Sequence, residues 1–140
     1  MGRVNYGAEM WDRKGLLGPA LLGQQFLYHW DNFPLPLTNV DDAEFQANDR
    51  IRFEKRPLLL RGTLKIDGLP QDTFVKLPGF KKGVVFVNGR ALSRYWEVGP
   101  QKTAYCPATW LQPGDNRITV LETEGFKKPQ IEFCDTPDLG

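Results

Sequence analysis

Apolar and polar residues alternate along most of the sequence after residue 57, and this alternation predicts a series of short β-strands. Leu60, Leu64 and Ile66 alternate with polar residues, as is typical of a half-buried strand. Further strands are predicted over residues 73–77, 84–87, 103–106 and 118–122 and around 131–133, with one helical turn over 108–112 and a tight turn over 113–116. Gly and Pro residues separate these strands at intervals of about ten residues, a spacing typical of all-β folds. The pattern predicts an all-β fold, an antiparallel β-sandwich or jelly roll.

The centre of this pattern is a predicted hairpin over residues 82–96. Residues 84–87 are apolar on both alternating sets, which indicates a strand covered on both faces. Asn88 and Gly89 follow, and both tolerate the positive φ that a two-residue type I′ turn requires. The chain is therefore expected to double back through Leu92 to Trp96, with Asn88 and Gly89 as structural residues of the turn.

Residues 1–37 form a β-rich strip in which Phe26, Tyr28 and Trp30 alternate with other residues. A period of two gives a strand with one aromatic face, and such a face is expected to be buried. It would pack either onto the sandwich of residues 57–140 or against a second copy of the chain in a homodimer. Residues 38–56, between the strip and the predicted sandwich, are mostly charged or polar and are interpreted as a connector with little regular structure.

Composition narrows the possible functions. The chain has 140 residues, 41% of them hydrophobic, and a net charge of +1 with both signs interspersed, so nucleic acid is not expected as a partner. The sequence contains neither an apolar run long enough for a membrane span nor a leader pattern, which favours a cytoplasmic location. The two cysteines, Cys106 and Cys134, are expected to be free thiols. With His29 as its one histidine, the chain is expected to bind neither a metal ion nor a cofactor.

The segment from Gly83 to Thr103, GVVFVNGRALSRYWEVGPQKT, resembles the C-terminal β-domain of glycoside hydrolase family 35 β-galactosidases. The resemblance continues through Trp110 and residues 114–122 to Gly140, and it includes residues 2–7 and 69–74. Ser93 departs from the family pattern, which usually has Gly there. The resemblance implies a galactose-binding-domain-like fold for residues 57–140, and it implies that residues 1–37 correspond to the end of the preceding β-domain.

In this family the catalytic glutamates lie on a TIM barrel, which takes about 250 residues. We therefore expect no catalytic residue in this chain, which would not be an enzyme by itself. Glu122 and Glu124, two positions apart on one predicted strand, are interpreted as strand-end carboxylates rather than as an acid and a nucleophile. The resemblance implies a non-catalytic domain in carbohydrate metabolism whose partners are the catalytic barrel and the preceding β-domain.

The alternative is a stand-alone carbohydrate-binding module for galactose-type sugars. Aromatic faces and convergent polar groups are typical of sugar sites. The candidate residues for a galactoside are Asn88, Arg94, Tyr95, Trp96 and Trp110, although packing in the core or between domains is the favoured explanation for the aromatic ones. Arg94 and Glu122 are also predicted as structural residues, because Glu122 shares a strand face with Ile118 and Val120 and would need a basic partner when buried.

Overall fold

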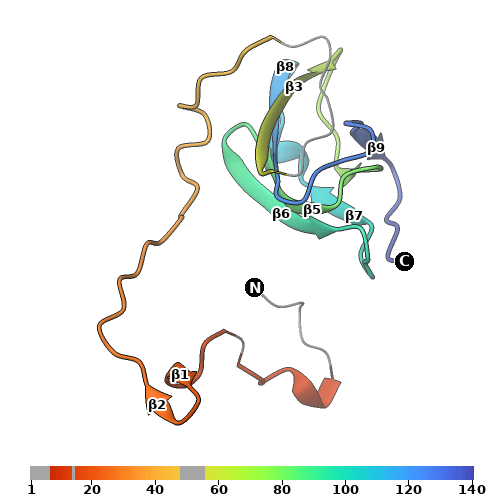
Figure 1. The fold of residues 1–140 in the computed structure, drawn as a ribbon. Coiled ribbons are helices and arrows are strands. Elements are labelled where there is room, and N and C mark those ends of the chain that lie inside the picture. Colours follow the sequence, from red (N-terminus) through yellow and green to blue (C-terminus); the bar gives the residue numbers. More distant parts are fainter. Residues whose placement is uncertain (1–6, 14, 48–55) are drawn as a thin grey trace. The chain divides into compact units, whose positions relative to one another are not determined.

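A computed structural model describes residues 7–13, 15–47 and 56–140 of the chain. The family-like segment at residues 2–6 and the 48–55 part of the expected connector lie outside the described residues. The chain divides into two compact units, Met1–Pro36 and Leu37–Gly140. Each unit is described separately below, and Figure 1 shows their strands. Leu37, the last residue of the expected strip, and residues 38–47 of the expected connector belong to the second unit.

The first unit has little regular structure among its described residues. A 3-10 turn, η1 (Gly7–Glu9), precedes a hairpin of two short antiparallel strands, β1 (Leu21–Leu22) and β2 (Gln25–Phe26). The expected aromatic strand through residues 26–30 is wrong, because β2 ends at Phe26 and His29 has a φ of +62°. A strand needs a neighbouring strand with which to exchange backbone hydrogen bonds, and the alternation of side chains does not say whether such a neighbour is present.

The second unit is an antiparallel sandwich of two sheets, as the alternation predicted (Figure 1). One sheet has the strand order β3-β8-β5-β6, made of β3 (Leu58–Ile66), β8 (Gly114–Glu122), β5 (Lys82–Val87) and β6 (Arg90–Trp96). The other has the order β7-β4-β9, made of β7 (Thr103–Cys106), β4 (Thr73–Lys76) and β9 (Glu132–Cys134). A 3-10 turn, η2 (Ala108–Trp110), follows β7.

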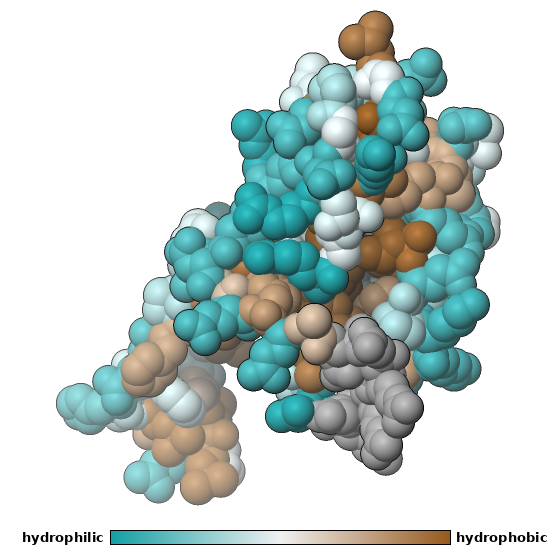
Figure 2. All heavy atoms as spheres, turned by 90° about the horizontal axis from the view of Figure 1, so that it is seen from above, coloured by the Kyte–Doolittle hydropathy of each residue, from teal (hydrophilic) through white to brown (hydrophobic). Residues whose placement is uncertain are grey.

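The core lies between the two sheets. Alternate residues of β4, β5 and β8 point into it and are almost completely buried, among them Val75, Val85, Val87, Ile118 and Val120. Phe80 and Phe126 close the core with ring centroids 5.8 Å apart. Hydrophilic residues cover much of the face drawn nearest in Figure 2. The core residues show that one apolar face of each sheet is turned inward, as in other β-sandwiches.

The central hairpin has the predicted form. Val87 pairs with Arg90, and the two residues between them, Asn88 and Gly89, have φ values of +48° and +78°. The turn expected over residues 113–116 is shorter than predicted, since β8 begins at Gly114, in register with Ile66. β3 has nine residues, and its last three residues pair with residues 114–116, which are therefore part of β8.

Candidate functional site

The carboxylate of Glu122 is completely buried at the end of β8, where it accepts hydrogen bonds from the backbone. Lys81 N–H donates to Oε2 at 2.8 Å, Lys82 N–H donates to Oε1 at 3.2 Å, and Glu124 N–H donates to Oε1 at 2.8 Å. The Tyr95 hydroxyl donates to Oε2 at 3.1 Å. These donors satisfy both oxygens from several sides, so this carboxylate ties β8 to the start of β5 and to β6.

The register of the sheet explains why Tyr95 reaches this carboxylate. Gly83 on β5 pairs with Tyr95 on one side and with Glu122 on the other, so the three residues share one face. A Cβ at Gly83 would overlap the carbonyl oxygen of Leu121 and would lie 2.8 Å from the Tyr95 hydroxyl oxygen. Burial, reinforced by the neighbouring carboxylate of Glu122, raises the pKa of Tyr95, which keeps its hydroxyl a donor.

The predicted pairing of Glu122 with Arg94 is wrong. Glu122 is buried as expected, but Arg94 pairs with Val84, one position beyond Gly83, and is exposed. Successive residues of a strand point to opposite faces, so Arg94 and Tyr95 cannot both reach Glu122. Neutral donors around the carboxylate take the place of the expected cation.

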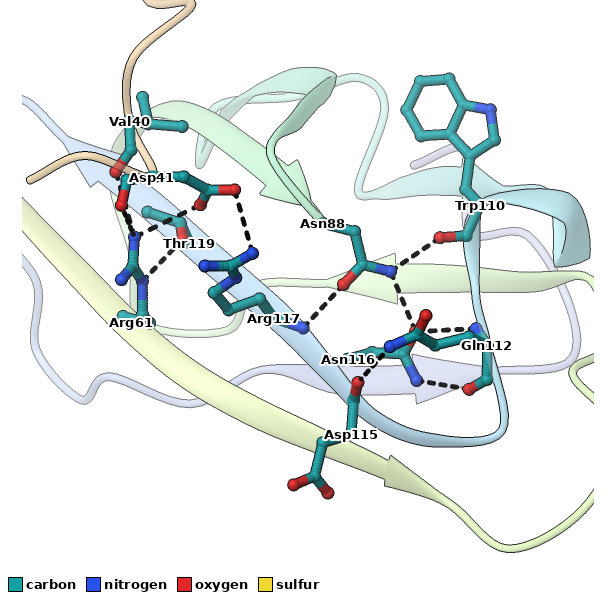
Figure 3. Close-up of polar contacts among 10 residues, drawn as sticks. All are labelled: Val40, Asp41, Arg61, Asn88, Trp110, Gln112, Asp115, Asn116, Arg117 and Thr119. Atoms are coloured by element: carbon teal, nitrogen blue, oxygen red, sulfur yellow. Dashed lines mark hydrogen bonds and ion pairs between the residues drawn. The ribbon is translucent and has the colours of Figure 1, made fainter.

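A network of side-chain amides fixes the turn after β5 to the loop before β8 (Figure 3). The amide nitrogen of Asn88 donates to the carbonyl of Trp110 at 2.8 Å and to Asn116 Oδ1 at 3.0 Å, while its oxygen accepts from Arg117 N–H at 2.9 Å. Asn116 is fully buried, donates to the carbonyl of Gln112 at 2.7 Å and accepts from the N–H of Gln112 at 2.9 Å. Asn88 therefore uses both of its polar atoms within the protein.

The five residues considered for sugar binding fall into two groups at opposite ends of β6. Trp110 lies near Arg90 at the start of β6, with 5.7 Å between the guanidinium carbon and the ring centroid. Trp96 is the last residue of β6, where the ammonium of Lys82 lies 5.1 Å from its ring centroid. Seven extended residues place these ends roughly 20 Å apart. The five side chains do not converge on one monosaccharide.

The described surface is hollowed beside the amide network. One depression of about 300 Å³ is lined by Asn88, Arg90, Thr109, Trp110, Leu111, Gln112 and Arg117. A second depression of about 180 Å³ lies beside it, lined by Thr63, Asn88, Gln112, Asp115, Asn116 and Arg117. Both are mostly open to solvent, which differs from the enclosed clefts of small-molecule sites.

A cluster of charged residues that the sequence did not indicate joins the start of the second unit to its sheet. The carboxylate of Asp41 lies 3.3 Å from Arg61 on β3 through one oxygen and 3.3 Å from Arg117 on β8 through the other (Figure 3). Thr63 and Arg117 are register partners, which places the two arginines on the same face of adjacent strands. The strand register would be enough to predict that the two arginines lie close together. The position of Asp41 between them could be found only from the structure.

The cysteines are free, as predicted: Cys106 is buried and Cys134 is half-buried. They lie on β7 and β9, on either side of β4, so they are not on neighbouring strands. Burial raises the pKa of the Cys106 thiol to about 11, which makes it a poor nucleophile. Among the described residues, no His, Cys, Asp and Glu side chains are grouped to hold a metal ion, and no helix is long and apolar enough to cross a membrane.

Comparisons with known proteins agree with the fold. Residues 57–116 match the family model of the galactose-binding domain of β-galactosidase, and residues 1–36 match that of its first all-beta domain. The chain is 41% identical over 143 residues to the human β-galactosidase-1-like protein 2 and 43% identical over 144 residues to β-galactosidase 1 of Dictyostelium discoideum. These alignments cover 99% and 97% of this chain but 22% and 21% of the relatives. The chain thus spans about a fifth of the length of these relatives.

Proposed function

The chain belongs to the β-galactosidase family, and we propose that it acts as the non-catalytic C-terminal β-region of such an enzyme, packing against the catalytic barrel and the preceding β-domain. In this role it stabilises the arrangement of the enzyme's domains. The galactoside would be hydrolysed elsewhere, on the barrel that the resemblance implies.

The observation that carries this proposal is the apolar surface of the first unit. Within residues 7–36, most large apolar side chains are exposed: Met10, Trp11, Leu16, Leu17, Leu21, Leu22, Phe26, Tyr28, Trp30, Phe33 and Leu35. A hairpin whose two strands have two residues each is too small to form a core of its own. Large apolar side chains exposed in this number are typical of an interface, and the match to a first all-beta domain suggests that the rest of that domain covers them.

The carboxylates of the second unit support a non-catalytic role. Glu122 is enclosed by backbone donors, whereas the Glu124 carboxylate is half exposed and lies 3.5 Å from the Lys82 ammonium. A retaining glycosidase needs two carboxyl groups about 5 to 5.5 Å apart that face one bond in a cleft. Glu122 is 0% exposed and cannot face a substrate bond in a cleft, so we expect the purified chain not to hydrolyse a chromogenic galactoside. Hydrolysis that survives repurification would contradict this expectation.

A chimaera tests the architectural role directly. In β-galactosidase 1 of Dictyostelium discoideum, the matching region would be replaced by this chain, and in a second form it would be deleted. We expect the chimaera to be soluble and active on galactosides and the deletion form to lose both properties, because its interfaces are bare. A deletion form as soluble, stable and active as the chimaera would refute the proposal.

Galactoside binding is a second candidate, supported by the depression of about 300 Å³ where Trp110 and Arg90 lie together. An indole face and a guanidinium are groups that sugars bind in proteins. Titration with methyl β-galactoside, monitored by nuclear magnetic resonance, should shift the signals of residues around Trp110. Arg90 is exposed, so Arg90→Ala should leave the fold intact and make these shifts smaller. Wild-type spectra that do not change at millimolar sugar would eliminate this candidate.

A further inference from the structure

The face of the four-stranded sheet that points away from the sandwich core is also covered. Val85 and Val87 point into the core, so Phe86 between them lies on the opposite face, yet its exposed fraction is 0%. Its register partner Thr119 is 1% exposed. An outer sheet face is ordinarily solvated, and complete burial of these two residues means that another segment covers them.

Residues 40 and 41 lie on this face. Arg61, the register partner of Thr119, donates from its guanidinium to the Thr119 hydroxyl at 3.4 Å and to the carbonyl of Val40 at 3.1 Å. The side chain of Val40 is only 5% exposed, although Val40 precedes the first strand of the sandwich by many residues. Figure 3 shows Val40 and Asp41 beside Arg61 and Thr119. This segment therefore covers the sheet at β3 and β8.

Two further contacts hold the segment in place. The Asp41 carboxylate bridges Arg61 and Arg117, and one of its oxygens lies 2.5 Å from the point where a Cβ would stand at Gly89. On the other side, the guanidinium carbon of Arg61 lies 3.7 Å from the ring centroid of Phe45. Arg61 is thus held between Asp41 and Phe45, a stacked and paired geometry that suits a guanidinium.

We propose that residues 37–45 form a strap, a segment that closes the outer face of the four-stranded sheet and is locked there by Asp41. The strap is part of the sandwich, so the connector to the preceding unit is anchored to β3 and β8 by these residues. The strap covers the part of this face formed by Arg61 on β3 and Arg117 on β8. The inference rests on contacts within the second unit and does not depend on the proposed function.

The test compares Asp41→Ala with Asp42→Ala in the full chain. Asp42 is the adjacent, exposed carboxylate, so its substitution changes the same charge without removing the two arginine contacts. Glutamyl endopeptidase cleaves after Glu44 only when the surrounding residues detach from the sheet, because a protease binds an extended segment. Cleavage after Glu44, followed by mass spectrometry, therefore reports detachment of the strap.

We expect Asp41→Ala to raise the cleavage rate about tenfold, which corresponds to the combined strength of two partly exposed ion pairs. The amide hydrogens of residues 39–45 should exchange faster to a similar extent, while Asp42→Ala should behave as the unaltered chain. Arg117→Gln is the second variant, and it should give a smaller increase because Arg61 still holds Asp41. Equal cleavage and exchange in all four proteins, or an unaltered chain that is unprotected over residues 39–45, would overturn the proposal.

Discussion

Glu122→Gln should destabilise the sandwich strongly, although it changes only one oxygen to an NH₂ group. If the amide nitrogen takes the Oε2 position, Tyr95 can turn its hydroxyl to accept, but Lys81 N–H then faces another donor. If it takes the Oε1 position, the N–H groups of Lys82 and Glu124 face it. Either orientation leaves at least one backbone donor unpaired at a site where Glu122 is 0% exposed.

Each buried donor left without an acceptor costs about 1 to 3 kcal/mol, and loss of the negative charge weakens the hydrogen bonds that remain. We therefore expect the free energy of unfolding to fall by about 2 to 5 kcal/mol. Urea denaturation of the full chain, followed by far-ultraviolet circular dichroism, measures this change. In a thermal scan each kcal/mol should lower Tm by roughly 3 to 5 °C for a domain of this size.

Glu124→Gln is the matched control, because the same chemical change is made two residues away on a half-exposed side chain that lies 3.5 Å from the Lys82 ammonium. It should alter the free energy of unfolding by about 0.5 kcal/mol or less. If the free energy of unfolding of Glu122→Gln also differs from that of the unaltered chain by only about 0.5 kcal/mol or less, the buried carboxylate is not an essential tie between β8, β5 and β6.

Gly83→Ala should lower the free energy of unfolding by about 2 kcal/mol or more, because the added Cβ overlaps a carbonyl of the neighbouring strand, and an unchanged urea midpoint would contradict this. Gly89→Val should destabilise the chain by a similar amount, since Gly89 has a φ of +78° that a β-branched residue adopts only with strain; a wild-type Tm would refute the turn assignment. Hydrogen bonding from Lys76 holds the pKa of Asp138 below 3.8, so the stability that Asp138 contributes is present above that pH and is lost as the pH falls through the lower folded-state pKa. Asp138→Asn should therefore reduce the acid dependence of stability below about pH 4, and identical pH profiles would contradict the ion pair.

Much of the sandwich could be predicted because its signals are local. Asn88 and Gly89 specify their turn by backbone preference alone, and alternation over 60–66 and 103–106 needs no knowledge of the partner strands. The aromatic alternation from Phe26 to Trp30 carries the same kind of signal but produced a wrong strand. The difference is that a strand also requires a neighbouring backbone, which lies outside any local window.

The details of the candidate site depend on register, and sequence spacing does not determine register. Arg94 and Tyr95 are adjacent, and only the pairing of Tyr95 with Gly83 decides which of them faces Glu122. Asp41 lies in the segment that was interpreted as a polar connector, and the two arginines that contact it come from strands far along the chain. The charge pair predicted for Arg94 and Glu122 was therefore wrong, and the ion pairs of Asp41 were not predicted at all.

The pairing of β3 with β8 along nine positions also determines the order in which the sandwich can assemble. β5 and β6 are joined by a two-residue turn and can pair early, whereas β3 has to wait for β8, which is synthesised only after β4, β5, β6 and β7. Such non-local pairing slows folding, because a long loop must close before its contacts form. During synthesis, Leu58–Ile66 leaves the ribosome with an unpaired edge, a state in which β-strands associate with other chains. We therefore expect the yield of folded protein to depend on how long β3 stays unpaired before β8 is synthesised.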